Sequence, residues 1–368
     1  MKIIDVKFYV LEQRLEYTFH WRKGLPGSGD GTSLAGDVSV GGLLRIVTDE
    51  GIDGVAPVSH GRIMADLVKR RLREELVGQD PLMTEWLWHR VWEIDRLEEF
   101  PIYALGVADI ALWDIKGKVA GLPLYRLLGG YRDRIPAYAS TVTFDSLEEY
   151  RRIIELCLEV GYRAFKLHAW GDLRRDAELA HALRRWVGDD IPLMFDASAG
   201  WNYQQALWFG RHLEAADYYW YEEPMREFDL YSYAKLCADL DIPILSAETS
   251  DGCHWNAADF IQQRAGDMIR TSAHYKGGIT GAMKIAHLAE SFGMSAQVHG
   301  GGLANLHLCC AIPNCDFYED LVISEEQIRS RTRGELAIDS EGCVRVPERP
   351  GLGLEVDWAE VEKRALSV

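Results

Sequence analysis

The chain repeats one pattern in three segments: Ile191-Pro-Leu-Met-Phe-Asp196, Tyr218-Tyr-Trp-Tyr-Glu222 and Ile242-Pro-Ile-Leu-Ser-Ala-Glu248. Each is a short apolar run that ends in an acidic residue, and the three acids are 26 residues apart in both intervals. Short apolar runs predict buried strands, and the intervals leave room for one helix each. Carboxylates that end successive parallel strands converge at one end of a β/α barrel. Because three oxygen donors suit a hard divalent cation, the pattern predicts a metal site.

The composition argues against several classes of partner. The 368-residue chain has a net charge of −17, which disfavours binding to nucleic acid or to an anionic membrane. It has no apolar run near the roughly 20 residues of a membrane span, and its start lacks the apolar core of a signal peptide. Its seven cysteines form no CxxC pair. We therefore expect reduced thiols in a cytoplasmic protein that acts on a small molecule.

The first part of the chain is expected to form an α+β domain over residues 1–132. Alternating apolar residues predict antiparallel strands at Lys2–Val10 and Gly42–Val47. The polar, glycine-rich stretch from His20 to Gly36 is long for a hairpin connection, and such loops often act as lids. Residues 62–128 are expected to be mainly helical, and Gly129-Gly130 ends that block.

From about Ile135 the chain alternates between strands and helices, which predicts an α/β barrel over residues 133–324. The expected strands are Ile135–Ala139, Ala164–Leu167, Leu193–Phe195, Tyr218–Tyr221, Ile244–Ala247, Met268–Thr271, Ser295–Val298 and a short segment before Glu319. A doubly wound sheet is the alternative, but no Gly-rich phosphate loop follows the first strand. Residues 325–368 are expected to fold back on the first domain.

Polar residues recur where the predicted strands end, which is where barrel enzymes place their chemistry. Lys166 and His168 are two residues apart and so point the same way from one strand. The complete series is Lys166, His168, Asp196, Glu222, Glu248, Ser272 or His274, His299 and Glu319. One such residue alone would be unremarkable, whereas a series at one register predicts an active site.

Several motifs make the chain resemble the enolase superfamily, mandelate racemase subgroup, over nearly its whole length. They are Ala108-Asp-Ile-Ala-Leu-Trp-Asp-Ile-Lys-Gly117, Leu127-Leu-Gly-Gly130, Phe195-Asp-Ala-Ser198, Tyr221-Glu-Glu-Pro224, Ala247-Glu248, Gly277-Gly-Ile-Thr280 and His299. The resemblance implies a modified (β/α)7β TIM-like barrel with an α+β N-terminal capping domain, which the C-terminal segment completes. It also implies a homo-oligomer, from dimer to octamer.

The resemblance further implies Mg²⁺ held by Asp196, Glu222 and Glu248. Glu223 would not be the main ligand, because neighbouring residues on a strand point to opposite faces. Ser198 stands where many members have asparagine. The shared chemistry is removal of a proton next to a carboxylate, with the enediolate stabilised by Mg²⁺. Glu319 matches a position that hydrogen-bonds the same carboxylate, for which it would have to be protonated.

The chain departs from the subgroup pattern on both sides of the expected site. Most members have Lys-x-Lys where this chain has Lys166-Leu167-His168, so His168 takes the position of the base and Lys166 contacts substrate. Histidine titrates near neutrality without help, which makes the exchange chemically sensible. On the other side His299 is present, but Ser272 replaces its usual Asp partner. His274, two residues on, is a candidate to orient His299.

These features favour a Mg²⁺-dependent dehydratase of an acid sugar, either an aldonate or an aldarate. His168 or His299 would remove the C2 proton, and the product would be a 2-keto-3-deoxy acid. A racemase or epimerase of a 2-hydroxy acid is the runner-up, and a non-catalytic binding protein is a third hypothesis. A zinc hydrolase barrel would need histidine-rich ligands. Candidate substrate-binding residues are His20, Trp21, Arg22, Lys23, Ser59, His60, Ser140, Ser272 and His274.

Overall fold

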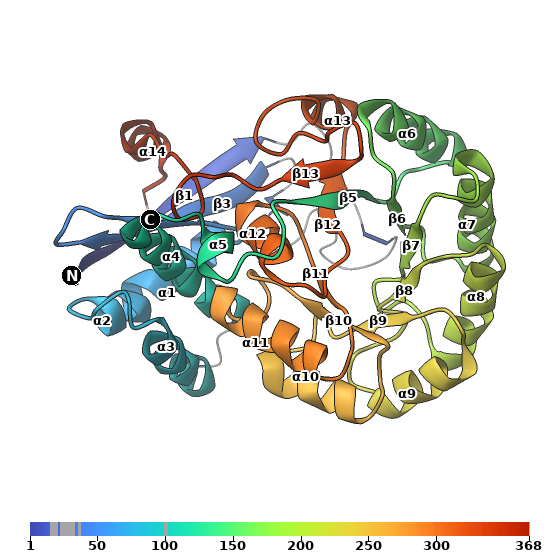
Figure 1. The fold of residues 1–368 in the computed structure, drawn as a ribbon, viewed down its shortest axis with the longest axis horizontal. Helices are drawn as coiled ribbons and strands as arrows, with labels where there is room; N and C mark the ends of the chain where they lie inside the picture. Colours follow the sequence, from blue (N-terminus) through green and yellow to red (C-terminus); the bar gives the residue numbers. More distant parts are fainter. Residues whose placement is uncertain (15–20, 23–33, 36–37, 99–101, 368) are drawn as a thin grey trace.

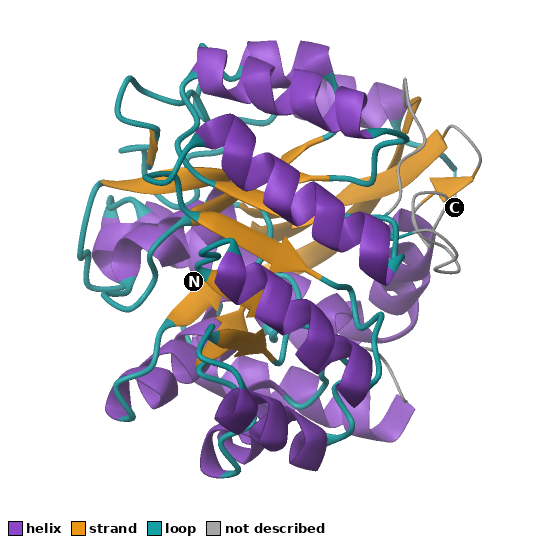
Figure 2. Cartoon of the chain, turned by 90° about the vertical axis from the view of Figure 1, so that its right-hand side faces the viewer, coloured by secondary structure: helices purple, strands orange, loops and turns teal. Residues whose placement is uncertain are grey.

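The computed structural model describes residues 1–14, 21–22, 34–35, 38–98 and 102–367. A smaller N-terminal unit lies on one side of a ring of strands, and helices surround that ring (Figure 1). The view turned by 90° shows the same helices outside the strands (Figure 2).

Eight parallel strands form the ring, within residues 134–322, all of which the structure describes. They are β5 (Arg134–Thr141), β6 (Phe165–His168), β7 (Leu193–Asp196), β8 (Trp220–Glu222), β9 (Ile244–Ser246), β10 (Met268–Thr271), β11 (Ala296–Val298) and β12 (Tyr318–Val322). Their hydrogen-bonded order is β11-β10-β9-β8-β7-β6-β5-β12. One helix separates each consecutive pair: α6 (Leu147–Val160), α7 (Leu173–Val187), α8 (Tyr203–Ala215), α9 (Leu230–Asp239), α10 (Cys253–Gln262), α11 (Gly278–Ser291) and α12 (Leu303–Ala311). The expected (β/α)7β arrangement is confirmed.

Local sequence signals set where the barrel helices begin and end. Ser146 and Asp172 precede α6 and α7, and their side chains accept hydrogen bonds from backbone N–H groups of the first turn. Gly161 and Gly188 follow the same helices with positive φ values of 124° and 83°. That conformation is costly for other residues, so these glycines end the helices and let the chain turn into the next strand.

The strand boundaries differ from the expectation at the last strand. Glu319 was expected to follow a short strand, but it is the second residue of β12 and pairs with Tyr138 of β5. The prediction was wrong because the apolar run before Glu319 is very short. The strand is defined instead by its pairing with β5, which continues through Val322.

The N-terminal unit is an antiparallel sheet with helices packed against it. β1 (Ile3–Arg14) and β3 (Val38–Thr48) extend beyond the two expected strands, and β2 (Leu34–Ala35) and β4 (Gly54–Val58) pair with β3. The helical elements that follow are α1 (Gly61–Leu67), η1 (Val68–Leu72), α2 (Arg73–Leu76), α3 (Thr84–Glu98), α4 (Ile102–Ala120) and α5 (Leu124–Leu127).

The C-terminal segment contacts both units. After α13 (Glu325–Ser330), β13 (Cys343–Arg345) pairs antiparallel with β5 of the barrel. The last helix, α14 (Trp358–Arg364), lies beside β1, where Trp358 packs on Tyr9 with ring centroids 5.6 Å apart. Leu366 then bridges to Val10. The end of the chain therefore completes the N-terminal unit.

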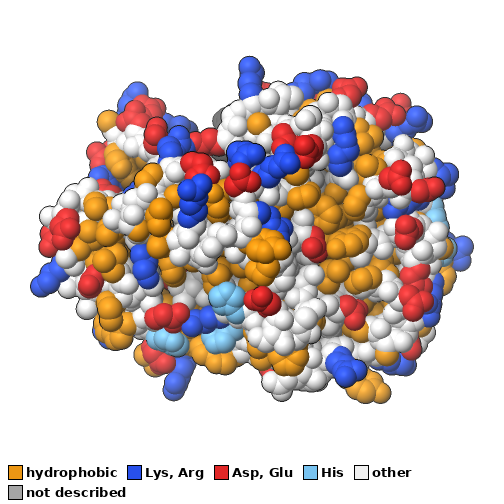
Figure 3. All heavy atoms as spheres, viewed as in Figure 1, with side chains coloured by type: hydrophobic (Ala, Val, Ile, Leu, Met, Phe, Trp, Pro, Cys, Tyr) orange, Lys and Arg blue, Asp and Glu red, His pale blue; other side chains and the backbone are white. Residues whose placement is uncertain are grey.

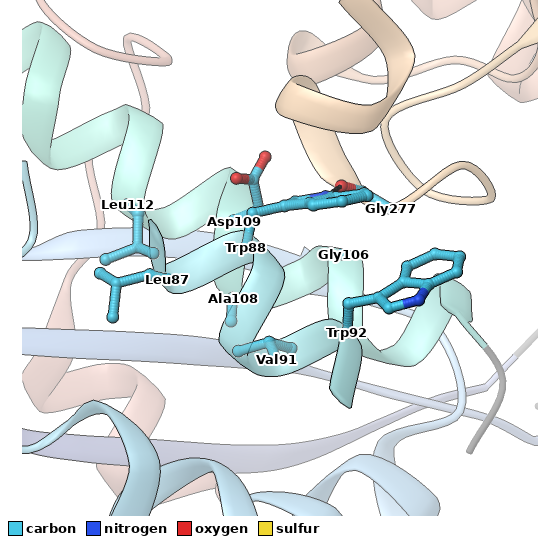
Figure 4. A pocket seen from close by; sticks show the side chains of 9 residues that line it. All are labelled: Leu87, Trp88, Val91, Trp92, Gly106, Ala108, Asp109, Leu112 and Gly277. Carbon is cyan, nitrogen blue, oxygen red and sulfur yellow. Dashed lines mark hydrogen bonds between the residues drawn. The ribbon is translucent and has the colours of Figure 1, made fainter. Parts of the chain in front are cut away.

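Helices α3 and α4 hold the N-terminal unit against the loop that follows β10 (Figure 4). Trp88 of α3 donates its indole N–H to the Gly277 carbonyl at 2.6 Å. Buried Asp109 of α4 accepts hydrogen bonds from the backbone N–H and the hydroxyl of Thr280, at 2.8 and 2.6 Å. Both contacts lie at the start of α11, so they position the N-terminal unit over the carboxyl ends of the strands.

The interior of the barrel contains a small apolar cluster of its own, made of Tyr138, Ala164, Met194, Trp220 and Leu245. Met194 and Trp220 each lie two residues before an acid, Asp196 and Glu222, and so share its side of the strand. The acids therefore stand one layer above an apolar floor.

The surface mixes charges of both signs. Acidic and basic side chains are interspersed on the face drawn in Figure 3. Among the described residues, no helix is both long enough and apolar enough to cross a membrane. All seven cysteines are free, and five of them are buried.

Candidate active site

A cavity of about 420 Å³ opens at the carboxyl ends of the barrel strands. Residues from β6 to β12 and their following loops line it, and Trp21 of the N-terminal unit covers part of it. The lining residues are Trp21, His168, Asp196, Ser198, Ala199, Glu223, Arg226, Glu227, Glu248, Thr249, Tyr275, His299, Gly300, Gly301, Glu319 and Leu321. Most polar residues predicted from the strand ends therefore meet in one place.

The predicted acids lie on three neighbouring strands. Asp196 of β7 pairs in register with Glu222 of β8, and Glu248 follows β9. All three side chains are buried. Glu222 lies deepest, where Arg270 of β10 donates to both of its carboxylate oxygens, one of them at 2.8 Å. This two-pronged pair is the geometry that favours arginine over lysine.

Lys166 stands between the acids of opposite strands. Its ammonium lies 3.0 Å from Glu222, 2.9 Å from Glu319 and 3.4 Å from Asp196. Burial disfavours its charged form, but Glu222 and Glu319 outweigh burial and raise the pKa of Lys166 well above its usual range. Lys166 is therefore a fixed positive charge at the centre of the site.

The acidic set fits a hard divalent cation. Ligand atoms of Glu222, Glu248 and His299 lie within 4.8 Å of one another. Asp196, the third predicted ligand, is outside this group, and its Oδ2 lies 3.0 Å from His168 Nε2 and 3.4 Å from Lys166 Nζ. Glu248 Oε2 is buried and no hydrogen-bond donor is aligned with it. His299 Nδ1 lies 2.9 Å from this oxygen. Hard cations prefer the carboxylate oxygens of this group over the imidazole nitrogen.

His168 is held from two sides. Its Nδ1 donates to the Thr141 carbonyl at 2.6 Å, and its Nε2 lies 3.0 Å from Asp196 Oδ2. The Trp21 ring packs on the imidazole with centroids 4.9 Å apart. Nε2 therefore faces the acids and the cavity, as a base at this position requires.

His299 approaches the acids from the other side of the site. Its Nδ1 lies 2.9 Å from Glu248 Oε2 and 3.4 Å from Glu319 Oε2, in ion-pair contact. Burial lowers the pKa of His299, but the two carboxylates outweigh it and raise the pKa to about 10. Tyr275 stacks on the ring with centroids 4.8 Å apart. Glu248, Glu319 and Tyr275 thus orient His299.

Ser272, which stands in the place of the missing Asp partner, and His274, the candidate to orient His299, both have other surroundings. Ser272 accepts hydrogen bonds from the backbone N–H groups of His274 and Tyr275, so it stabilises the turn after β10. His274 is outside the cavity lining. Burial and the nearby His299 lower its pKa to about 4. A neutral imidazole cannot raise the pKa of His299 as an aspartate would.

Glu319 is surrounded by cationic groups, which favour its ionised form over the protonated form that was expected. Burial alone would raise its pKa, but Lys166, Arg270 and His299 hold the pKa of Glu319 well below its usual range. The backbone N–H of Gly300 also donates to it at 2.8 Å. The expectation considered only the neighbouring acids and missed the two buried cations beside Glu319.

Glu223 and Glu222 turn in different directions, as expected for neighbours on a strand. The Glu223 carboxylate accepts from the backbone and the hydroxyl of Thr249, at 3.1 to 3.2 Å, and lines the cavity wall. Ser198 directs its backbone N–H to Asp196 Oδ1 at 2.7 Å. Ser198 thus supports Asp196, whereas Glu223 is held by Thr249.

The predicted substrate-binding residues divide into three groups. Trp21 lines the cavity, and Arg22 lies beside it over the loops after β6 and β7. His20 and Lys23 lie outside the described residues. Ser59 and His60 precede α1, and Ser140 is buried within β5, so none of these three lines the cavity.

Several residues of the site were not predicted, among them Arg270, Tyr275 and Arg226. Arg270 could have been predicted from the sequence, because it is the only charged residue of the strand Met268–Thr271 and a buried charge needs a partner of opposite charge. Tyr275 and Arg226 lie on loops, where no periodicity indicates which way a side chain points.

Comparison with known proteins gives matches over most of the chain. Residues 149–361 match the family model described as enolase C-terminal domain-like. Residues 22–129 match the mandelate racemase / muconate lactonizing enzyme N-terminal domain. The arabinonate dehydratase of Saccharolobus solfataricus is 30% identical over 301 residues, covering 78% of this chain and 80% of that protein. The 3,6-anhydro-alpha-L-galactonate cycloisomerase of Streptomyces coelicolor is 30% identical over 337 residues, covering 88% and 91%.

A solved structure of similar fold covers the whole chain. The crystal structure of D-glucarate dehydratase from Agrobacterium tumefaciens, complexed with magnesium, has a TM-score of 0.90 and 32% sequence identity and covers 100% of both chains. The fold is therefore shared with a protein whose solved structure is described as a D-glucarate dehydratase.

Proposed function

The chain belongs to the enolase superfamily, in its mandelate racemase and muconate lactonizing enzyme group, and from this premise we propose that it is a dehydratase of acid sugars. One observation carries the proposal. The acids of β7, β8 and β9 are flanked by His168 of β6 on one side and by His299, after β11, on the other. Dehydration needs one base and one acid around a stabilised carboxylate, and this arrangement supplies both.

Asp196, Glu222 and Glu248 would hold Mg²⁺, which when bound supplies Lewis-acid stabilisation of negative charge on the substrate carboxylate. Lys166 adds a permanent positive charge beside the same acids. Glu319 positions both Lys166 and His299 through its two carboxylate oxygens. The cationic groups thus surround the place where charge develops during the reaction.

The two histidines perform the proton transfers. One of them removes the proton from C2 of the substrate, which breaks the C2–H bond. The other gives a proton to the C3 hydroxyl, which leaves as water and forms the C2–C3 double bond. The resulting enol then takes a proton at C3 and releases the proton of its C2 hydroxyl, which gives a 2-keto-3-deoxy acid. The histidine that took the C2 proton loses it again and the other histidine regains a proton, so the net change is the loss of one water molecule.

A panel of aldonates and aldarates tests the proposal. With Mg²⁺, at least one sugar acid should yield a keto acid that semicarbazide traps, measured by absorbance and confirmed by mass spectrometry. Adding excess EDTA should stop product formation. If no acid sugar of the panel gives a keto acid from protein that binds Mg²⁺, the proposed dehydratase activity is refuted.

An isomerase is the second candidate, because groups able to exchange protons stand on both sides of the acids. The similar protein from Streptomyces coelicolor named as a cycloisomerase supports it. In D₂O, a racemase or epimerase of a 2-hydroxy acid would incorporate deuterium at C2 without loss of water. Proton NMR of the same incubations separates this outcome from dehydration.

Replacing Arg270 with methionine should destabilise the protein, most strongly without metal. The change leaves Glu222 buried without its two-pronged partner, so we expect the free energy of unfolding to fall by about 3–5 kcal/mol in EDTA. Saturating Mg²⁺ should recover part of this loss, since the cation restores positive charge beside Glu222. Urea denaturation followed by circular dichroism measures both values.

Arg331→Met is the matched control. Arg331 also donates twice to one carboxylate, that of Asp320, at 2.7 and 2.9 Å, but this pair does not line the cavity. Its loss of stability should be the same with and without Mg²⁺. If Mg²⁺ restored the free energy of unfolding equally in the two variants, a metal site around Glu222 would be contradicted.

A further inference from the structure

Two arginines, Arg226 in the cavity lining and Arg22 beside Trp21, have no acidic partner among the described residues. Arg226 lines the mouth on the loop after β8. Arg22 belongs to the N-terminal unit and follows Trp21, which itself packs on His168. In the described part of the chain neither guanidinium has an ion pair, and Arg22 Nε is buried without a hydrogen-bond partner. A buried donor on a charged group is costly when it is left unpaired.

Two glycines leave room for the Arg22 side chain. A Cβ atom at Gly171 would lie 2.7 Å from Arg22 Cγ, and one at Gly200 would lie 3.2 Å from Arg22 Nε. Gly171 follows β6 and Gly200 follows β7, so the arginine lies across the loops that carry His168 and Asp196. The placement of Arg22 is therefore defined by the barrel as well as by the N-terminal unit.

The two positive charges also act on each other. Burial, together with the charge of Arg226, lowers the pKa of Arg22. Glu227 lines the same wall, yet it forms no ion pair with either arginine among the described residues. Like charges at a cavity mouth repel unless an anion lies between them. Such an arrangement is suited to an anionic group of the ligand.

We propose that Arg22 and Arg226 bind a second carboxylate of the substrate, so that the preferred substrates are aldarates, acid sugars with a carboxylate at each end. The inference rests on the proposed function and narrows its substrate class. The first carboxylate lies at the acids and Lys166, and the chain of hydroxyl-bearing carbons extends to the mouth. The planar fork of a guanidinium matches a carboxylate in two hydrogen bonds.

Paired substrates of the same configuration test the proposal with the full chain and Mg²⁺. Galactarate and galactonate form one pair, and glucarate and gluconate form another. We expect kcat/KM to be about ten- to a hundredfold higher for the aldarate of the preferred pair, the effect of one charge-assisted contact. In Arg22→Gln and Arg226→Gln, KM for the aldarate should rise by about tenfold or more, while the aldonate values stay within about twofold.

Two further variants make the test specific. Arg22→Lys keeps the charge and loses the fork, so it should retain part of the preference. Arg175→Gln is the matched control, because Arg175 stacks on Trp170 near Gly171 but does not line the cavity. This control should keep the full preference for the aldarate.

Binding experiments separate this inference from the proposed function. Isothermal titration calorimetry with Mg²⁺ should show tighter binding of the aldarate than of the aldonate, and Arg22→Gln should remove the difference. That result would support the second carboxylate site even if no keto acid formed. If aldonates give keto acid as efficiently as aldarates and neither arginine variant changes the ratio, the inference is overturned while the dehydratase stands. Preference for an aldonate with a terminal phosphate would also overturn it.

Discussion

Asp196→Asn is expected to abolish Mg²⁺-dependent turnover, lowering kcat/KM by about 10³-fold or more. The change keeps the shape of the side chain but removes one of three negative oxygen donors and the carboxylate that faces His168 at 3.0 Å. A metal contributes several kcal/mol to the stabilisation of charge in the transition state, which corresponds to a loss of this size. Keto-acid formation measures the rate, and calorimetric titration with Mg²⁺ should show binding weakened at least about a hundredfold.

Glu223→Gln is the control for this variant. Glu223 is an acid of the same cavity, next to Glu222 in sequence, but its oxygens accept from Thr249. Its Mg²⁺ affinity should therefore change by less than about tenfold. If Glu223→Gln lost Mg²⁺ binding and Asp196→Asn kept it, the assigned ligand set would be wrong.

The second large effect concerns the two histidines. His168→Asn and His299→Asn should each lower kcat by about 10²–10⁴-fold with little change in KM, because each removes a proton-transfer group and leaves the metal acids in place. The variants should differ in D₂O. The one that lacks the base loses exchange of the C2 proton, whereas the one that lacks only the acid keeps it. Proton NMR of the substrate measures this exchange.

His181→Asn controls for the loss of a histidine as such. His181 of α7 contacts His212 of α8 at 3.1 Å, on helices that surround the strands. Its kcat should stay within about twofold of the parent. Full activity in both His168→Asn and His299→Asn would contradict their assigned roles.

The sequence predicted the barrel well because each strand and each acid obeys a local rule. The apolar runs before Asp196 and Glu222 are long enough to define strands, and their spacing matches one strand and one helix. The pairing of Asp196 with Glu222 follows from this repeat. The position of Glu319 was mispredicted because its strand depends on pairing with β5, a contact between distant parts of the chain.

The electrostatics of the site could not be predicted in the same way. Whether Glu319 is protonated depends on Lys166 and Arg270, whose distances follow only from the curled arrangement of the strands. Likewise, His299 gains its high pKa from Glu248 and Glu319, which come from two other strands. Sequence periodicity gives the direction of a side chain, whereas a pKa depends on which charges surround it.

The mouth of the cavity depends on contacts between the two units. Trp21 and Arg22 were candidates only because the first loop is polar and long. Their positions depend on the packing of Trp21 on His168 and of Arg22 against Gly171 and Gly200. No local signal in the sequence indicated that Arg226 would lie near Arg22.

Proton NMR of the reaction in D₂O tests the central claim most directly, namely that this site removes the C2 proton of a sugar acid and expels the C3 hydroxyl. With Mg²⁺ and the preferred aldarate, the C2 proton signal should disappear while a 2-keto-3-deoxy acid with deuterium at C3 accumulates. Neither change should occur in EDTA or with Asp196→Asn. A keto acid that forms equally fast in EDTA, or an unchanged spectrum for every sugar acid with Mg²⁺ bound, would contradict the account.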